Sequence, residues 1–180
     1  MRIISGIYKG RRLNPPMNLP VRPTTDMAKE ALFNILNNIL DYEETVALDL
    51  FAGLGNISFE LISRGCTSVT AVDNNLKCTG FIKKAAEELK MTGISTVKAD
   101  AFSFIRKISV KFDFIFADPP YDNPELAELP NLIFDGGLLN DDGLFVLEHP
   151  DIYDFSEHPN FFDHRVYSRV NFSFFRQTEA

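Results

Sequence analysis

The stretch Phe112-Asp113-Phe114-Ile115-Phe116-Ala117-Asp118-Pro119-Pro120-Tyr121 decides how the rest of the chain is read. Residues 112–117 form an apolar run typical of a buried β-strand. Neither Pro119 nor Pro120 has a backbone N–H to donate, so the strand cannot continue through them and the chain leaves the sheet at Asp118. In open α/β sheets, ligands bind outside the carboxyl ends of the strands. We therefore expect Asp118 to line a binding site.

The tetrapeptide 118–121 combines acceptors with an aromatic face. The Asp118 carboxylate and the carbonyls around Pro119 can accept both hydrogens of an exocyclic amine. Tyr121 offers a flat surface on which a base can stack. We predict that Asp118, Pro119, Pro120 and Tyr121 form a pocket for a flipped nucleobase. Taken alone, the tetrapeptide is also compatible with a simple turn after a strand.

Strand-like and helix-like stretches alternate from residue 46 onward. The expected strands are 46–51, 69–72, 96–99, 112–117 and 144–147, and the expected helices are 56–64, 76–91, 102–108 and 126–134. Repeated βα units predict an α/β fold with a mostly parallel sheet and helices on both faces. Residues 162–170 and 172–176 predict an antiparallel pair, which brings the expected sheet to seven strands.

The residues before this alternation predict a small N-terminal extension. Residues 2–13 suggest a short β-hairpin that turns at Ser5-Gly6, and residues 14–23 form a proline-rich loop. Apolar residues at helical spacing predict an amphipathic helix over 27–40. Thr24, Thr25 and Asp26 are good N-caps for this helix.

Composition limits the class of protein. The 180 residues are 45% hydrophobic and 24% charged, as expected of a globular chain with one core. There is no apolar run of about 18 residues and no signal-peptide pattern, so we expect no membrane span and a cytoplasmic location. Cys66 and Cys78 are too few for a disulfide framework or a four-cysteine zinc site, and we expect no metal. We also expect a monomer.

Charge is distributed unevenly along the chain. A net charge of −7 argues against a bulk electrostatic grip on nucleic acid. Residues 1–30 hold six basic and two acidic residues, a balance of +4, so the remaining 150 carry −11. A basic arm on an acidic body predicts that one edge contacts phosphates, although a solvated hairpin without a partner has the same pattern. The candidate contacts are Arg2, Lys9, Arg11, Arg12, Arg22, Thr24 and Thr25.

A glycine loop and a series of acids predict the cofactor. Gly53-Leu54-Gly55 joins the first expected strand to its helix, where glycine permits a tight turn and close approach of a ligand. Asp73 follows the second strand, where a carboxylate can accept both ribose hydroxyls. Acids at the strand tips disfavour a pyrophosphate and favour a ligand with a ribose, an adenine and a positive charge. S-adenosylmethionine fits, and its expected contacts are Asp49, Phe51, Gly53, Gly55, Asp73, Asn74, Asp100 and Ala101.

Nearly the whole chain resembles the RsmD family of class I, Rossmann-like methyltransferases. The resemblance rests on Arg2-Ile3-Ile4-Ser5-Gly6-x-Tyr8-Lys9-Gly10-Arg11-Arg12-Leu13, on Arg22-Pro23-Thr24-Thr25-Asp26, on Leu48-Asp49-Leu50-Phe51-Ala52-Gly53 and on Asp118-Pro119-Pro120-Tyr121. It implies that residues 1–26 form an RNA-contacting arm and that 27–180 form a methyltransferase domain dependent on S-adenosylmethionine. It also implies methylation of the N2 amine of one guanine in 16S rRNA of the small ribosomal subunit.

Three positions depart from the pattern of the family. Ser58 replaces a glycine that usually follows the cofactor loop, and Met27 stands where a basic residue is usual. Residues 170–172 lack a Tyr-Gly-acid sequence.

Other activities stay compatible with the same motifs. A DNA adenine-N6 or protein glutamine amino-methyltransferase could use the tetrapeptide, and so could a non-catalytic RNA-binding protein on this fold. However, 180 residues leave no obvious room for a DNA target-recognition insertion, a glutamine enzyme more often has Asn at position 118, and an inactive site needs no intact acids.

We expect His149 to be structural. Because the chain carries −7, we expect a protein-bearing ribosomal particle as substrate rather than naked RNA.

Overall fold

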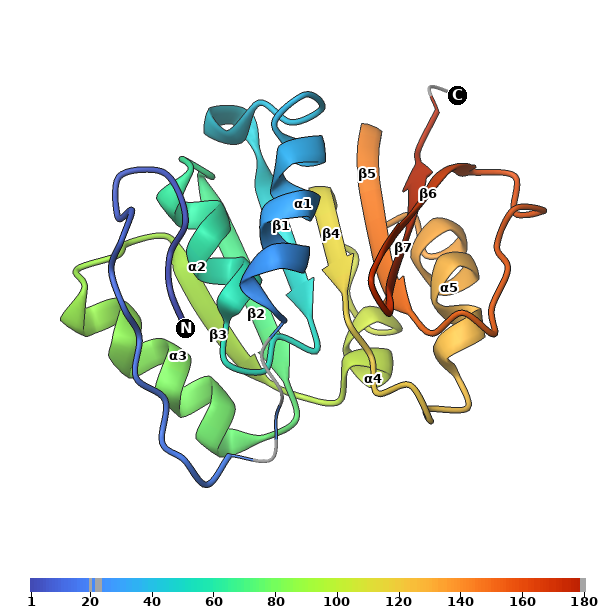
Figure 1. Ribbon diagram of the computed structural model, residues 1–180. Helices are drawn as coiled ribbons and strands as arrows, with labels where there is room; N and C mark the ends of the chain where they lie inside the picture. The colour runs from blue at the N-terminus through green and yellow to red at the C-terminus, as the bar shows by residue number, and fades with distance from the viewer. Residues whose placement is uncertain (20, 22–23, 179–180) are drawn as a thin grey trace.

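Among the residues that the structure describes, 1–19, 21 and 24–178, seven strands form one sheet (Figure 1). In this computed structural model they are β1 (Val46–Leu50), β2 (Ser68–Asp73), β3 (Ile94–Lys98), β4 (Phe112–Ala117), β5 (Leu139–His149), β6 (Phe161–Tyr167) and β7 (Val170–Arg176). Their order is β3-β2-β1-β4-β5-β7-β6. The first five are parallel, whereas β7 runs antiparallel between β5 and β6. The predicted sheet is confirmed.

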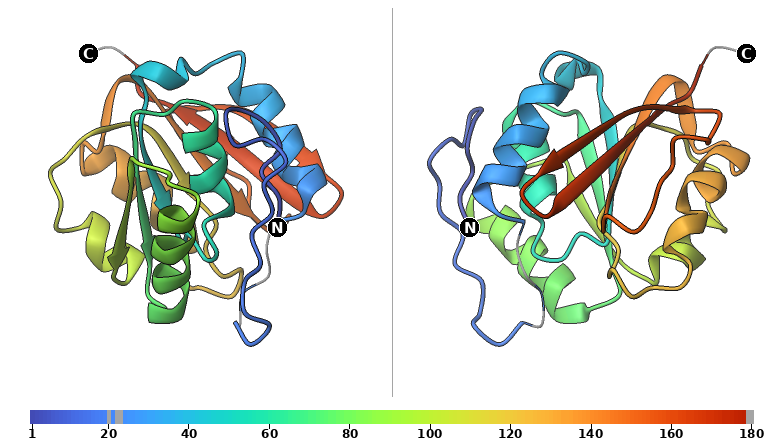
Figure 2. Two further views of the ribbon diagram at one scale, coloured as in Figure 1. Left: turned by 90° about the vertical axis from the view of Figure 1, so that its left-hand side faces the viewer. Right: turned by 45° about the vertical axis from the view of Figure 1, so that its right-hand side comes forward.

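Helices cover both faces of the sheet, as predicted (Figure 2). They are α1 (Asp26–Leu36), α2 (Asn56–Ser63), α3 (Leu76–Glu88), α4 (Ala101–Ile105) and α5 (Leu129–Asp135), with 3₁₀ turns η1 (Tyr42–Glu44) and η2 (Leu126–Glu128). One core lies between the sheet and α1, α2 and α3, and the other lies between the sheet and α4 and α5. Within the described ranges, no helix is long and apolar enough to cross a bilayer.

The alternation of side chains along β4 and β5 positions two acids at one edge. Phe116 packs in the core beneath α1–α3, and Ala117 packs in the core beneath α4 and α5. Strand β4 is therefore apolar on both faces from Phe114 onward, which explains its continuous apolar sequence over residues 114–117. Phe116 pairs in register with Val146 of β5. Because residues two apart share a face, Asp118 and Glu148 both continue the α1–α3 face beyond the core.

Several predicted boundaries change in the structure. Strand β5 begins at Leu139 rather than at residue 144, through an irregular pairing with the start of β4. The helix expected over 126–134 is divided into η2 and α5, with a proline in the first turn of α5. Helix α1 ends at Leu36 because the chain tightens into 3₁₀-type bonds, Asn38 N–H to the Ile35 carbonyl and Ile39 N–H to the Leu36 carbonyl.

The predicted N-terminal hairpin is wrong in its register. Arg2 pairs with Arg12 in a single antiparallel bridge, and the chain turns broadly through residues 5–10 instead of tightly at Ser5-Gly6. The reason lies in α2. The Glu60 carboxylate accepts the Ile4 and Ser5 N–H groups at 2.9 and 3.0 Å, so these amides are not free to pair with a second strand. The two ends of the arm therefore pair with each other through Ile3 and Arg11, while its turn is attached to the side of α2.

Candidate functional site

A cleft of about 1110 Å³ opens at the carboxyl ends of β1, β2, β4 and β5. It is bounded by the first turn of α1, by the loop between β1 and α2, and by the turn between β6 and β7, which reaches towards α1 (Figure 2). The structure brings most of the predicted site residues into this cleft: Asp49, Phe51, Gly53, Asp73, Asn74, Asp100, Ala101, Asp118, Pro119, Pro120, Tyr121, Thr24 and Thr25.

Gly55 is the predicted cofactor residue that does not line the cleft. It is the N-cap of α2 with φ +77°. A Cβ atom there would lie 2.8 Å from Ile82 Cγ1 and 3.0 Å from the Phe59 ring. The glycine is therefore required for packing of the β1–α2 loop against the side chains of α2 and α3. Gly53, in contrast, has φ +55° with open space around it, and its N–H donates to Asp73 Oδ2 at 2.8 Å.

Asp49 is a buried acid at the base of the cleft, with 1% of its surface exposed. It accepts hydrogen bonds from the Ser58 N–H at 3.1 Å and the Ser58 hydroxyl at 2.6 Å. Burial raises the pKa of Asp49 to about 7 in spite of these bonds. Ser58, which departs from the family pattern, thus holds the Asp49 carboxyl in place. A cationic ligand beside Asp49 would favour its ionised form.

Two further acids, Asp118 and Glu148, lie where β4 and β5 end. Burial raises the pKa of Asp118 well above its ordinary value, and the neighbouring charges of Glu148 and Asp49 raise it further. Burial also raises the pKa of Glu148 to about 7. The Tyr121 hydroxyl donates to Glu148 Oε1 at 3.1 Å, while Tyr121 as a whole stays 41% exposed at the edge of the cleft.

Asp49, Asp73, Asp118 and Glu148 determine which ligands the cleft can bind. Several carboxyl groups in one low-dielectric cleft disfavour phosphate and favour cations, hydroxyls and amines. Glu148 was not among the predicted site residues. The signal that could have identified it is the same as for Asp73 and Asp118, an acid at the tip of a strand.

His149 has the structural role that we expected. It is 1% exposed, its Nε2 lies 2.7 Å from the Ser173 hydroxyl, and its Nδ1 lies 2.8 Å from the Pro150 carbonyl. Both ring nitrogens are therefore engaged within the protein.

The predicted phosphate contacts fall into different places. Lys9, Arg11 and Arg12 are exposed on the arm, outside the cleft, and Arg2 forms a half-exposed ion pair with Asp26 at 3.5 Å. Arg22 lies outside the described residues. The Thr25 hydroxyl accepts the Ala28 N–H and caps α1, as capping alone would require. One basic residue that the sequence analysis missed, Arg169, lines the cleft from the turn between β6 and β7.

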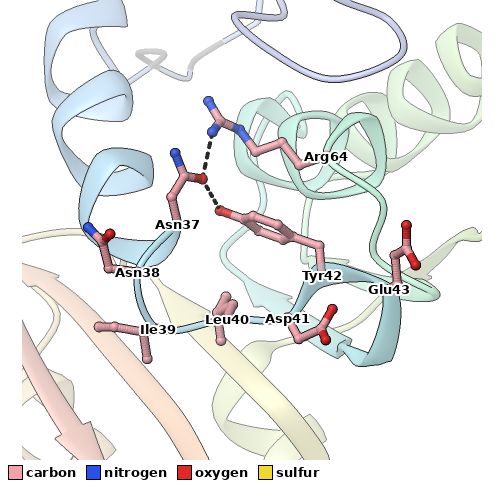
Figure 3. A pocket seen from close by; sticks show the side chains of 8 residues that line it. All are labelled: Asn37, Asn38, Ile39, Leu40, Asp41, Tyr42, Glu43 and Arg64. Atoms are coloured by element: carbon pink, nitrogen blue, oxygen red, sulfur yellow. Dashed lines mark hydrogen bonds between the residues drawn. The ribbon is translucent and has the colours of Figure 1, made fainter.

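A smaller hollow of about 500 Å³ lies at the opposite edge of the sheet, between the end of α1, η1 and the end of α2 (Figure 3). Its polar groups bind one another: the Tyr42 hydroxyl and Arg64 Nη1 both donate to Asn37 Oδ1 at 2.9 Å. Within the described part of the chain, no group of three or more His, Cys, Asp or Glu residues could hold a metal ion. The cleft is therefore the candidate site.

Comparison with known proteins identifies the family. A family model described as "Conserved hypothetical protein 95" matches residues 1–176. The chain is 37% identical over 153 residues to "Putative rRNA methyltransferase YlbH" of Bacillus subtilis, covering 83% of this chain and 82% of YlbH. It is 33% identical over 148 residues to ribosomal RNA small subunit methyltransferase D of Escherichia coli, covering 82% of this chain and 74% of that protein. The chain belongs to the RsmD family.

A solved structure extends this likeness to the fold. The RsmD-family chain matches "Putative methyltransferase yhhF" from Escherichia coli with a TM-score of 0.87 and 29% identity, over 99% of this chain and 98% of that one. Together with the strand order, this confirms the predicted class I methyltransferase fold.

Proposed function

We propose that the protein transfers a methyl group from S-adenosylmethionine to the N2 amine of a guanine in 16S rRNA. The observation that carries the proposal is that Asp118-Pro119-Pro120-Tyr121 line the same cleft as Gly53 and the acids Asp49, Asp73 and Asp100. Acceptors for an amine thus lie in the same cavity as acceptors for a ribose and a cation. The names of the relatives in Bacillus subtilis and Escherichia coli support ribosomal RNA as the substrate.

The cofactor is S-adenosylmethionine, and the acceptors of the cleft fit its groups. Asp73 accepts from the ribose hydroxyls, Asp100 accepts from the adenine amine, and Asp49 with the loop at Gly53 holds the cationic amino-acid end. Phe51, Asn74 and Ala101 also line the cleft, and we assign them to the adenine end. When bound, S-adenosylmethionine supplies a methyl group on a positively charged sulfur, which keeps the electron pair of the broken C–S bond.

The tetrapeptide holds the base. Tyr121 stacks on the flipped guanine, and its exposed ring at the mouth of the cleft is free to do so. The Asp118 carboxylate and the Pro119 carbonyl accept the two N2 hydrogens, which directs the nitrogen lone pair at the methyl group. As the new N–C bond forms, the amine releases one proton. Because burial raises the pKa of Asp118, its carboxylate can take up that proton. Positioning supplies much of the rate.

The remaining parts of the proposal concern the substrate. Residues 1–26 contact RNA through Arg2, Lys9, Arg11, Arg12 and Arg22, with Thr24 and Thr25 at the cleft, and residues 27–180 carry out the transfer. A protein of net charge −7 binds naked RNA weakly, so the substrate is a small-subunit particle. The protein acts as a monomer, and this substrate implies a cytoplasmic location.

Replacement of Asp118 tests the proposal. We expect Asp118→Ala to abolish methyl transfer to undermodified small subunits while calorimetric binding of S-adenosylmethionine persists. The matched control is Asp122→Ala, because Asp122 is an exposed acid next to the tetrapeptide that does not line the cleft. The control should transfer at the wild-type rate. Retained turnover in Asp118→Ala contradicts the role of this carboxylate.

A further inference from the structure

Glu148 is a buried acid of the cleft that the proposed mechanism does not use. Its exposed fraction is 6%, and it lines the cleft at the end of β5. Its Oε1 atom accepts the Tyr121 hydroxyl at 3.1 Å. Its Oε2 atom is fully enclosed and has no hydrogen-bond partner among the residues that the structure describes. A buried acceptor without a donor is unfavourable in a folded protein, and because Glu148 lines the cleft, a ligand towards which this carboxyl group turns is the natural source of that donor.

The register of the sheet places this acceptor beside Asp118. Ala117 of β4 pairs with Leu147 of β5, and the next residue on each strand is Asp118 or Glu148. Neighbouring strands lie about 4.8 Å apart, so the two carboxyl groups stand side by side on one face. A base whose amine is held by Asp118 must therefore present its adjacent edge atom to Glu148.

That edge atom differs between the purines. In guanine, the N2 amine is flanked by N1, which carries a hydrogen and donates, and by N3, which can only accept, so an acid beside the amine favours the N1 side. In adenine, the atom next to the N6 amine is also N1, but it carries a lone pair and can only accept. We propose that Glu148 accepts the N1–H of the target guanine and thereby makes the cleft select guanine over adenine. The inference rests on the proposed function, because it takes Asp118 to hold the N2 amine.

The charges around Glu148 agree with this role. Asp118 is its acidic neighbour and Tyr121 its hydroxyl donor. Among the described residues, no Lys or Arg forms an ion pair with Glu148, although Arg169 lines the same cleft. Burial raises the pKa of both Glu148 and Asp118. A ligand edge with adjacent donors, N1–H and N2–H, stabilises both groups as carboxylates together. An adenine edge would place its N1 lone pair against the Glu148 carboxylate. Contact between two acceptors is unfavourable.

The test compares two bases that share the N2 amine. 2-Aminopurine carries that amine but has an unprotonated N1, so it cannot donate to Glu148. After the methylated guanine has been mapped, small subunits are reconstituted with guanine or 2-aminopurine at that position, and labelled methyl transfer is measured. We expect the wild type to prefer guanine by at least about tenfold in kcat/KM. In Glu148→Gln, the side-chain amide can donate to the unprotonated N1 of 2-aminopurine, whereas the N1–H of guanine loses its charged acceptor. Transfer to guanine should therefore fall at least about tenfold, and the preference for guanine should disappear or reverse.

Controls separate this role from damage to the site. Glu148→Gln should bind S-adenosylmethionine like the wild type. Tyr121→Phe removes the hydroxyl that donates to Glu148 but keeps the carboxylate, so it should lower transfer to both bases and keep the guanine preference. Loss of the preference in Tyr121→Phe to the same extent as in Glu148→Gln overturns the inference. So does an unchanged preference in Glu148→Gln when the wild type methylates guanine. No transfer to guanine by the wild type contradicts the proposed function as well.

Discussion

The attachment of the N-terminal arm depends on a buried ion pair between Lys29 and Glu60, and either residue can be replaced by mutation. Lys29 Nζ lies 3.3 Å from Glu60 Oε2, and the two side chains are 1% and 0% exposed. Lys29 also donates to the Arg2 carbonyl at 2.6 Å and to Asn56 Oδ1 at 2.8 Å. Glu60 in turn accepts two amides of the arm and is paired with Arg64 at 2.9 Å. The pair therefore joins the arm, α1 and α2.

The two replacements should differ in magnitude. Glu60→Gln leaves Lys29 charged, although burial already lowers the pKa of that amine, and the two arm amides lose a charged acceptor. Removing one partner of a buried pair costs about 3–5 kcal/mol. For a domain of this size that corresponds to a fall in Tm of about 6–20 °C. Lys29→Met should cost less, because Glu60 keeps Arg64 as its counter-ion.

Thermal and urea unfolding of the two variants and of the double variant measures these effects. The double variant should lose less stability than the sum of the single variants, because Lys29 and Glu60 are removed together and neither is left without the other. Arg64 loses Glu60 both in Glu60→Gln and in the double variant, so this loss does not affect the comparison. The matched control is Lys84→Met, since Lys84 and Glu88 form an exposed pair at 3.8 Å whose loss should change stability little. Additive losses in the double variant, or a Glu60→Gln loss no larger than that of the control, would refute the reasoning.

Other predictions follow from the arm and the cleft. Gly6→Ala should displace the arm and speed its proteolysis, because a Cβ atom would lie 1.7 Å from the Ser63 carbonyl oxygen; Gly10→Ala, with the same positive φ but no atom within 4 Å, should be far milder. The pKa of Asp49 is raised to about 7, so the free protein should lose stability as pH rises from about 4 through 7, whereas affinity for cationic S-adenosylmethionine should increase over the upper part of that range. Both trends should become shallower in Asp49→Asn, as measured by urea unfolding and by calorimetry, while Asp118 and Glu148, whose pKa values are also raised, keep part of the stability slope. Unchanged slopes would contradict the assignment. Asp73→Ala should weaken cofactor binding at least tenfold in calorimetry, because a ribose acceptor and the acceptor of the Gly53 N–H are lost together; unchanged affinity would exclude Asp73 from the site.

The sheet and most of the cleft could be predicted from the sequence because their signals are local. An apolar run that ends in Asp118-Pro119-Pro120 specifies both a strand and its end, and the same holds for the acid at Asp73. Parallel strands bring these tips to one edge whatever lies between them. Asp49 was predicted in the same way, as an acid near the end of the first strand.

The features that were missed depend on contacts between distant residues. The predicted hairpin register was wrong because the Ile4 N–H donates to the Glu60 carboxylate, which is 56 residues away in sequence. The importance of Glu148 depends on its place beside Asp118, which is set by the pairing of β5 with β4. The role of Ser58 likewise becomes visible only when its hydroxyl is seen on Asp49.

The most direct test of the central claim is labelled methyl transfer from S-adenosylmethionine to three acceptors side by side: undermodified small ribosomal subunits, naked small-subunit RNA and unmethylated duplex DNA. The account predicts label in the subunits, weaker label in naked RNA, and recovery of the label as N2-methylguanine. Label in DNA alone, or in RNA at a position other than guanine N2, would contradict it.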